Sequence, residues 1–123
     1  MKKILLTFDL EEFDLPKEFD ISISENEMYS ISKQGLTNLL ELLDRYKIKA
    51  TFFTTANFAK RYSKIIKNLI DTGHEIASHG YSHSFLDQTF DKIKKAKKEI
   101  EKITQTKIKG FRAPRFKINN ISE

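Results

Sequence analysis

Hydrophobic and polar positions follow one another along this chain at two different spacings. Four short runs are dominated by apolar, aromatic or β-branched side chains and end at polar or charged residues: 3–8, 50–55, 74–78 and 108–112. Such runs are typical of strands buried in a parallel sheet. Pro114 ends the last run, because proline lacks the N–H group that a sheet needs.

Longer segments between these runs carry apolar side chains at the spacing of an amphipathic helix. The pattern predicts helices over 35–46, from the capping residue Asn57 to about residue 70 with Gly73 just past its end, and over 87–104. Residues 13–32 are polar and irregular, which predicts a long functional loop. The expected inward-facing side chains are Leu36, Leu39, Leu40, Leu43, Phe58, Tyr62, Ile65, Ile66, Leu69, Ile70, Phe90, Ile93, Ile100 and Ile103.

Alternating strands and helices predict an α/β fold, with about four parallel strands and three helices joined by right-handed crossovers. A length of 123 residues indicates one domain, since domains usually contain roughly 100–200 residues. Ligands of such sheets bind at the carboxyl ends of the strands. The residues that follow each predicted strand are therefore the first candidates for function.

Composition excludes several classes of protein. Because the chain has no cysteine, it forms no disulfide, and any metal must be held by His, Asp or Glu. Lysines dominate the net charge of +5, and many lie between residues 92 and 109. Arginine, the usual bidentate ligand of phosphate, is scarce. We interpret the lysines as a solvated helix face and expect no nucleic-acid binding.

No segment reaches the roughly 20 apolar residues of a membrane span. The N-terminus begins as a signal peptide does, but Asp9, Glu11 and Glu12 interrupt the apolar run before the roughly 7–15 residues that a signal requires. We therefore expect a chain that begins at residue 1 and stays in the cytoplasm.

Two histidines follow the third predicted strand. His79 and His83 are four residues apart, and in a helical turn or tight loop this spacing places both imidazoles on one side, where they can bind one cation. The alternative is a coincidence of one buried and one exposed histidine. The remaining histidine, His74, is expected to be structural and hydrogen-bonded.

Carboxylates follow the first predicted strand. In an extended segment Asp9 and Glu11 point the same way and Leu10 the other way. Two carboxylates directed at one place repel each other unless a cation neutralises them. With the histidines they predict a facial His, His, carboxylate site, which suits Zn²⁺, with iron, cobalt and nickel as alternatives. The other interpretation is that Glu11, Glu12 and Asp14 are solvated loop charges, as we expect of the last two.

Arg112 ends the fourth predicted strand, which should lie near the first. Its guanidinium can hold the Asp9 carboxylate ionised and oriented; an ordinary surface arginine before a turn is the alternative. Pro114 fixes the chain direction, so that the following N–H groups can point into the cleft.

Three segments together resemble the polysaccharide deacetylases, the NodB-homology or carbohydrate esterase family 4 enzymes. Thr-Phe-Asp-Leu-Glu at 7–11, His-Gly-Tyr-Ser-His at 79–83 and Arg-Ala-Pro-Arg-Phe at 112–116 occur in the order of the family's first three motifs. The segments 50–53 and 73–76 are also similar, so the resemblance covers nearly the whole chain. It implies a distorted (β/α) barrel that removes N-acetyl or O-acetyl groups from an acetylated glycan with the help of a divalent metal.

Carried over by position, the resemblance implies that His79 and His83 are metal ligands. The family's metal-binding aspartate directly follows the catalytic base, where this chain has Leu10. Members with an acid two positions after the base use that acid, so the expected third ligand is Glu11. Gly80 stands where many members have Thr or Ser.

The resemblance further implies that Asp9 is the general base and that Arg112 orients it. Arg115, which follows Pro114, stands where many members have Tyr and contributes a backbone N–H to the oxyanion hole. In the family a histidine from a late motif protonates the leaving amine, and this chain has no later histidine and no Trp for the fourth motif. The activity of the chain is therefore doubtful.

The length of the chain also bears on whether it is active. A closed eight-unit barrel needs roughly 250 residues, so 123 residues correspond to about half a barrel, a single NodB-like domain (1–123) truncated at its C-terminus. We expect an open sheet edge near Phe111 that pairs with a second copy or a complementing chain. Three hypotheses follow: the N-terminal part of a sugar deacetylase, a non-catalytic metal- or glycan-binding module, and, least favoured, a basic nucleic-acid-binding domain.

Overall fold

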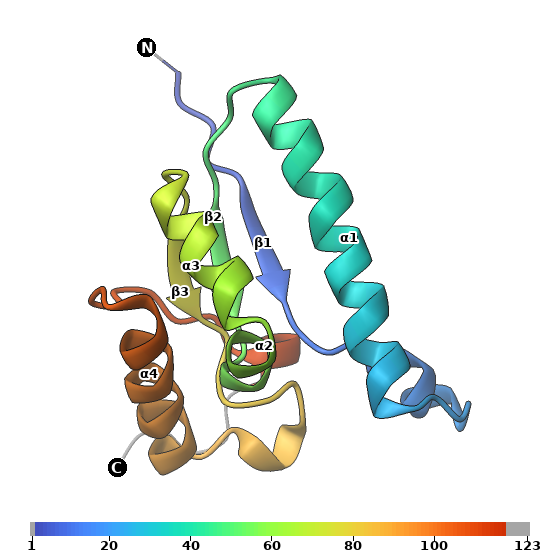
Figure 1. Cartoon of the computed structure of the whole chain (residues 1–123). Helices are drawn as coiled ribbons and strands as arrows, with labels where there is room; N and C mark the ends of the chain where they lie inside the picture. Colours follow the sequence, from blue (N-terminus) through green and yellow to red (C-terminus); the bar gives the residue numbers. More distant parts are fainter. Residues whose placement is uncertain (1, 118–123) are drawn as a thin grey trace.

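The computed structural model of the chain describes residues 2–117 and builds them around a parallel sheet (Figure 1). Its strands are β1 (Thr7–Leu10), β2 (Thr51–Thr54) and β3 (Glu75–Ser78), in the order β1-β2-β3. The strands pair in full register, Leu10 with Thr54 and Thr54 with Ser78. All three therefore end at the same edge of the sheet.

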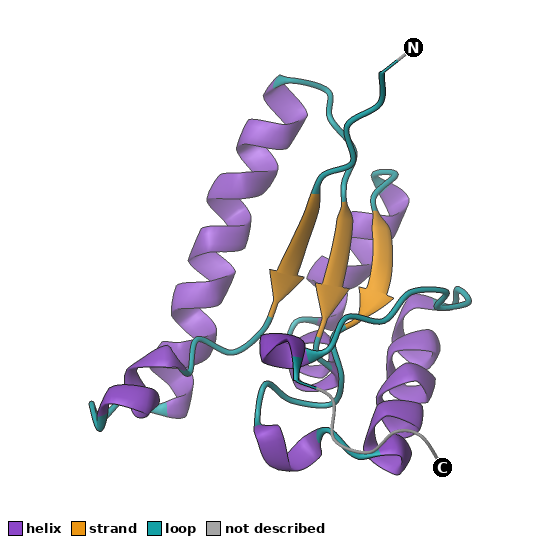
Figure 2. Ribbon diagram, turned by 180° about the vertical axis from the view of Figure 1, so that it is seen from behind, coloured by secondary structure: helices purple, strands orange, loops and turns teal. Residues whose placement is uncertain are grey.

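Helices surround the sheet unevenly. The α-helices are α1 (Glu25–Arg45), α2 (Ala56–Arg61), α3 (Ser63–Asp71) and α4 (Phe90–Thr104), and the 3₁₀ turns are η1 (Leu15–Phe19), η2 (Phe85–Asp87) and η3 (Pro114–Phe116). α2 and α3 cover one face, while α1 flanks β1 and α4 lies on the side of β3. Seen from behind, the strands have no α-helix of residues 2–117 in front of them (Figure 2).

The core lies between the sheet and the helices on its covered face. Phe52 of β2, Phe58 of α2 and Ile100 of α4 are fully buried there, and Phe8 stacks on Phe52 with ring centroids 5.6 Å apart. Strand side chains alternate between the two faces of the sheet. Thr7 and Asp9 therefore point to the face that no α-helix of the described residues covers, which we call the bare face. This alternation leaves the bare face free for polar groups.

The predicted α/β architecture is confirmed, but two of the predicted strands differ. Residues 108–112 form no fourth strand; a single parallel bridge joins Phe111 to Ser78, because the chain turns away at Pro114 after two ladder hydrogen bonds. The first strand begins at Thr7, and Ile4 and Leu5 before it are 87% exposed.

The first helix is longer than predicted, because α1 begins at Glu25 within the segment 13–32 that was expected to be a loop. Ser24 and Glu27 form a capping box: the Ser24 hydroxyl accepts a hydrogen bond from the Glu27 N–H, and the Glu27 carboxylate accepts one from the Ser24 N–H. These two bonds satisfy backbone groups that would otherwise be unpaired at the helix start.

The second predicted helix is two helices. Tyr62 leaves helical geometry (φ −120°, ψ 42°) and separates α2 from α3. The N-terminal cap of α2 is Thr55 rather than the predicted Asn57, since the Thr55 hydroxyl accepts a hydrogen bond from the Phe58 N–H. Gly73, as predicted, follows the end of α3 with a positive φ of 89°.

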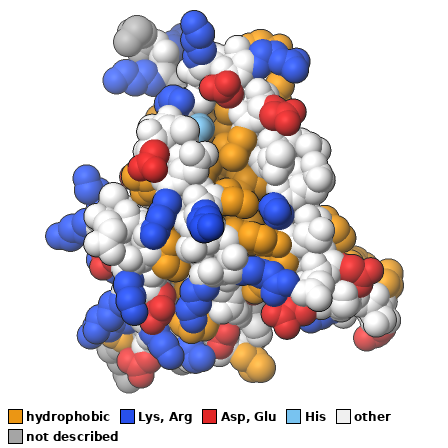
Figure 3. All heavy atoms as spheres, in the orientation of Figure 1, with side chains coloured by type: hydrophobic (Ala, Val, Ile, Leu, Met, Phe, Trp, Pro, Cys, Tyr) orange, Lys and Arg blue, Asp and Glu red, His pale blue; other side chains and the backbone are white. Residues whose placement is uncertain are grey.

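The lysines of α4 are exposed, as predicted, except Lys92, which is partly buried, and Lys and Arg side chains gather over this helix (Figure 3). Ala96 and Ile100 form its buried side, whereas Phe90, expected to face inward, is half exposed. Among residues 2–117, no helix combines the length and the apolar character needed to cross a membrane.

Candidate metal centre

The three strand ends bring the candidate residues together. Hydrogen bonding continues one residue past each strand: the Thr55 N–H donates to the Leu10 carbonyl (2.9 Å) and the His79 N–H donates to the Thr54 carbonyl (2.8 Å). Glu11, which follows Leu10, therefore lies beside the start of the loop that carries both histidines.

Both imidazoles face one carboxylate oxygen. Oε2 of Glu11 lies 2.8 Å from Nε2 of His79 and 3.2 Å from Nε2 of His83. His79 is buried and the other two side chains are partly buried. These three residues form a group whose ligand atoms all lie within 4.8 Å of one another.

The hydrogen bonds of the imidazoles determine which nitrogen carries the proton. Nδ1 of His79 lies 2.8 Å from the carbonyl oxygen of Arg112, and Nδ1 of His83 lies 2.8 Å from Oδ1 of Asp14. A carbonyl or carboxylate oxygen accepts, so each Nδ1 donates. For His83 we assign the proton toward the nearer Asp14, although Nη2 of Arg115, which can only donate, also lies 3.2 Å from the same Nδ1. In the neutral imidazole, Nε2 then carries a lone pair, and both lone pairs are directed toward Glu11.

This arrangement fits a divalent cation. Two imidazole lone pairs and a carboxylate oxygen repel one another when nothing lies between them. Oε2 of Glu11 is buried and has no hydrogen bond with any described residue. Ligands of a tetrahedral zinc ion, with bonds of about 2.0–2.1 Å, lie about 3.3 Å apart. The His83 separation of 3.2 Å is close to this value, and the His79 separation of 2.8 Å is shorter. Glu11, His79 and His83 could therefore hold a metal, each through one atom.

Asp9 lies next to this group and is bound by Arg112. Nη1 of Arg112 donates to Oδ1 of Asp9 (2.7 Å) and Nη2 donates to the hydroxyl of Thr7 (2.6 Å). The guanidinium also lies over the ring of Phe53, 4.1 Å from its centroid. The second oxygen of Asp9 lies 3.9 Å from Nε2 of His79, so it faces the candidate metal centre.

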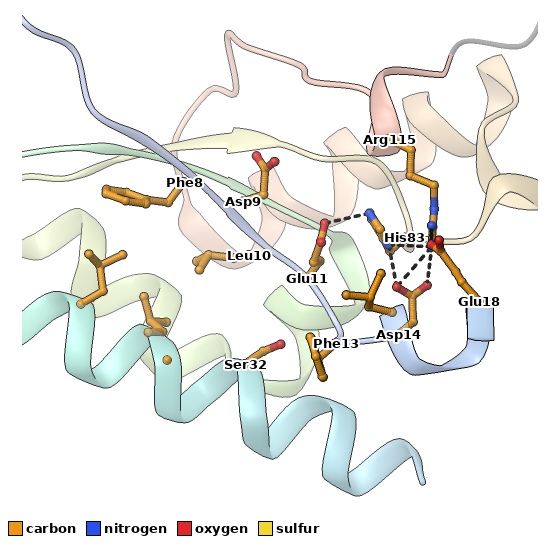
Figure 4. A pocket seen from close by; sticks show the side chains of 14 residues that line it. Phe8, Asp9, Leu10, Glu11, Phe13, Asp14, Glu18, Ser32, His83 and Arg115 are labelled. Atoms are coloured by element: carbon orange, nitrogen blue, oxygen red, sulfur yellow. Dashed lines mark hydrogen bonds and ion pairs between the residues drawn. The ribbon is translucent and has the colours of Figure 1, made fainter. Parts of the chain in front are cut away.

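Leu10 points away from the centre. Its side chain is buried in the core, and Figure 4 shows it on the side of β1 opposite to Asp9. The residue that stands where the family usually has a metal ligand is therefore a core residue in this fold.

Two acidic residues that were expected to be solvated are instead bound, so that prediction is wrong. Glu12 is buried, and its carboxylate accepts from the Thr55 hydroxyl and from the His83 N–H, both at 3.0 Å. Asp14 accepts from His83 and from Arg115. Alternation along β1 could have indicated the burial of Glu12, which is two residues after Leu10; we find no sequence signal for Asp14.

Pro114 and Arg115 lie across the centre from β1. Pro114 is buried, and Arg115 has a positive φ of 55°. The Arg115 guanidinium contacts Asp14 and Glu18. Its backbone N–H remains a predicted, untested oxyanion ligand.

His74 lies at the opposite end of β3 from His79. Its Nδ1 accepts a hydrogen bond from the Ala50 N–H (3.2 Å), and its ring meets Phe52 edge-on. Burial, and secondarily the positive charge of Lys49, lower the pKa of His74 below its ordinary value. His74 is thus a neutral, hydrogen-bonded residue of the structure.

A cavity of about 560 Å³ opens beside the centre between β1 and α1. Figure 4 shows Glu11, Asp14 and His83 at one end of it. Its remaining wall is largely apolar and includes Phe8, Phe13, Leu36 and Leu39.

Comparison with known proteins identifies the family. The polysaccharide deacetylase family model matches residues 1–122, so the chain belongs to the polysaccharide deacetylases. The predicted family is thereby confirmed. The fold class is confirmed too, because the solved structures that it resembles include polysaccharide and peptidoglycan deacetylases.

Individual relatives agree with this assignment. The chain is 31% identical to a peptidoglycan deacetylase of Helicobacter pylori, over 72% of this chain and 32% of that protein. It is 26% identical to a putative polysaccharide deacetylase of Mycobacterium smegmatis, with a TM-score of 0.70 over 94% of this chain and 44% of that one. It also resembles in fold a CE4 family pseudoenzyme of Bacillus anthracis, with 23% identity and a TM-score of 0.66 over 95% of this chain and 37% of that one.

These matches fix how much of the fold is present. The chain spans about a third of the length of the Helicobacter relative and less than half of the two structures. The three-stranded sheet is accordingly part of the larger domain that the relatives contain.

Proposed function

We propose that this chain carries the metal-binding part of a deacetylase that hydrolyses the N-acetyl or O-acetyl groups of a polysaccharide, with Zn²⁺ as its metal. The observation that supports this most is the convergence of Glu11, His79 and His83 on one point, with the Asp9–Arg112 pair beside it. A cation binder needs the first three residues; a hydrolase also needs a base next to them.

In this proposal each group has its own task. When bound, the metal supplies Lewis acidity, which polarises the acyl carbonyl and makes a water molecule more acidic. Asp9 takes the proton of the attacking water, through the oxygen that faces His79, and returns it to the leaving sugar nitrogen or oxygen as the acyl bond breaks. Arg112 holds the other Asp9 oxygen and keeps the carboxylate ionised. The Arg115 N–H, positioned after Pro114, stabilises the negative charge that develops on the carbonyl oxygen.

The second candidate function is a non-catalytic metal- or glycan-binding module that needs another chain. The observations that favour it are the similarity in fold to a pseudoenzyme and the bare face of the sheet. In addition, an apolar groove of about 350 Å³ runs along α4 and is lined by Phe90, Ile93, Ile108 and Phe111. A homodimer or a complementing chain would cover this groove; sedimentation of the purified chain measures whether it associates.

Acetate release separates the two functions. An acetylated chitooligosaccharide and a peptidoglycan fragment are incubated with the zinc-loaded chain, and His79→Ala serves as the control. The deacetylase proposal predicts release that a chelator abolishes and that the variant lacks. Zinc binding with no metal-dependent release from either substrate would favour the module.

A further inference from the structure

We propose that Asp14 is a positioning residue, whose carboxylate orients the imidazole of His83 toward the metal centre and is itself held by Arg115. The inference rests on the proposed metal site. It adds a residue that lies outside the three matching motifs.

The contacts of Asp14 are specific. Its side chain is 19% exposed, and Oδ1 lies 2.8 Å from Nδ1 of His83. Nη2 of Arg115 lies 3.3 Å from Oδ1 and 3.2 Å from Oδ2, and Arg115 also pairs with Glu18. Figure 4 shows dashed lines that join the Asp14 carboxylate to both the imidazole and the guanidinium.

The two histidines are held in different ways. His79 donates from Nδ1 to a backbone carbonyl, which no side-chain substitution removes. His83 donates to the Asp14 side chain. An acceptor at Nδ1 fixes both the tautomer and the rotation of the ring, and a charged acceptor makes Nε2 a stronger donor to a metal. Only His83 therefore depends on replaceable side chains: the Asp14 carboxylate is the acceptor, and Nη2 of Arg115 lies 3.2 Å from the same Nδ1.

Arg115 explains why Asp14 stays in place. Arg115 belongs to η3 and follows Asp14 by about a hundred positions in sequence. Its guanidinium contacts Asp14, which lies just before η1, and Glu18, which lies within η1. These ion pairs join two segments that border the same cavity. The side chain at position 115 thus has a role separate from that of its backbone N–H.

Zinc affinity tests the proposal. Asp14→Ala and the isosteric Asp14→Asn are compared with the unsubstituted chain by competition with a chromophoric chelator. Loss of an outer contact of a metal-binding histidine typically weakens binding 10- to 100-fold, and we expect a loss of about this size for Asp14→Ala. Asp20→Asn, which changes the same charge on an exposed residue nearby, should leave the affinity unchanged.

A double-mutant cycle separates positioning from a general structural effect. If Asp14 acts through His83, then Asp14→Ala lowers the zinc affinity of the unsubstituted chain but not that of the His83→Ala variant. An equal loss in both backgrounds, or a change of less than twofold in the first, would overturn the inference. Asp14→Asn provides the same comparison if the alanine variant does not fold.

The same measurements distinguish a failure of the proposed metal site from a failure of the role proposed for Asp14. If the unsubstituted chain binds no zinc, the proposed metal site fails and the inference fails with it. If it binds zinc and Asp14→Ala binds equally well, only the inference fails. The visible spectrum of bound Co²⁺ gives a second readout, because reorienting His83 alters the ligand geometry that sets the band intensities.

Discussion

Oε2 of Glu11 and Nε2 of His79 lie 2.8 Å apart, within about 0.5 Å of the spacing of two ligands of one zinc ion. The Nδ1 proton of His79 is donated to the Arg112 carbonyl, so in the neutral ring the nitrogen facing Glu11 has no proton to give. Both atoms can therefore donate a lone pair to one metal ion that lies between them.

The Asp9–Arg112 pair should affect hydrolysis and not metal binding. Replacing Arg112 with Met removes the guanidinium that holds Asp9, and we expect metal-dependent acetate release to fall by about 100-fold or more, the lower end of the range for general-base catalysis. Zinc affinity should stay within about twofold, because the backbone carbonyl that binds His79 remains.

Arg61→Met is the matched control, since Arg61 also lies over an aromatic ring, that of Tyr29, and pairs with a carboxylate away from the centre. A parallel loss of zinc affinity and activity in Arg112→Met would contradict separate roles.

Gly80 should resist replacement for a reason that lies in the backbone. Its φ is 84°, and a Cβ atom would come 3.2 Å from Oε1 of Gln88. We expect Gly80→Ala to lower the free energy of unfolding by about 1–2 kcal/mol, measured by urea denaturation. The threonine or serine common in the family at this position should be no better tolerated.

Gly35→Ala is the same substitution, but we expect it to raise the free energy of unfolding rather than lower it. Gly35 lies within α1, and nothing lies within 4 Å of an added Cβ. The variant should gain about 0.5–1 kcal/mol from helix propensity. A stable Gly80→Ala variant would show that the histidine loop does not need this conformation.

The start of α1 should depend on its cap. Ser24→Ala removes both hydroxyl contacts of the capping box and should lower the free energy of unfolding by about 1 kcal/mol. Ser30→Ala, an exposed change inside the same helix, should be neutral or slightly stabilising. Equal effects of the two changes in urea denaturation would contradict the assigned helix start.

His74 should make the chain less stable in acid. Because burial lowers its folded-state pKa, the unfolded chain takes up a proton first as the pH falls below about 6.5, and stability then declines until the folded-state pKa is reached. His74→Asn can still accept from the Ala50 N–H but does not titrate. Melting temperatures between pH 8 and 5, measured with a chelator present, should fall less steeply for the variant; identical slopes would contradict the assignment.

Much of the site could be predicted because it depends on short-range rules. Alternation along an extended segment places Glu11 on the side of Asp9 and Leu10 on the other, and the four-residue spacing brings His79 and His83 together. Parallel strands in register then carry these residues to one edge. The Asp9–Arg112 contact required only that the last segment return to the sheet.

The features of the site and fold that the sequence did not predict depend on contacts between distant segments or on weaker local signals. Asp14 is bound because η1 and η3 meet across the cavity, which no local pattern indicates. The beginning of α1 was missed although the sequence Ser-Glu-Asn-Glu at 24–27 has the spacing of a capping box, because the residues around it are polar. Residues 108–112 have the composition of a strand, but too few of their backbone groups pair with β3.

Direct measurement of zinc binding tests the central claim. In a calorimetric titration we expect the metal-free chain to bind one zinc ion, and Glu11→Ala and His79→Ala to bind it at least about 100-fold more weakly, since each loses a direct ligand rather than an outer contact. Zinc affinity that neither substitution lowers would contradict the claim that these residues form a metal centre.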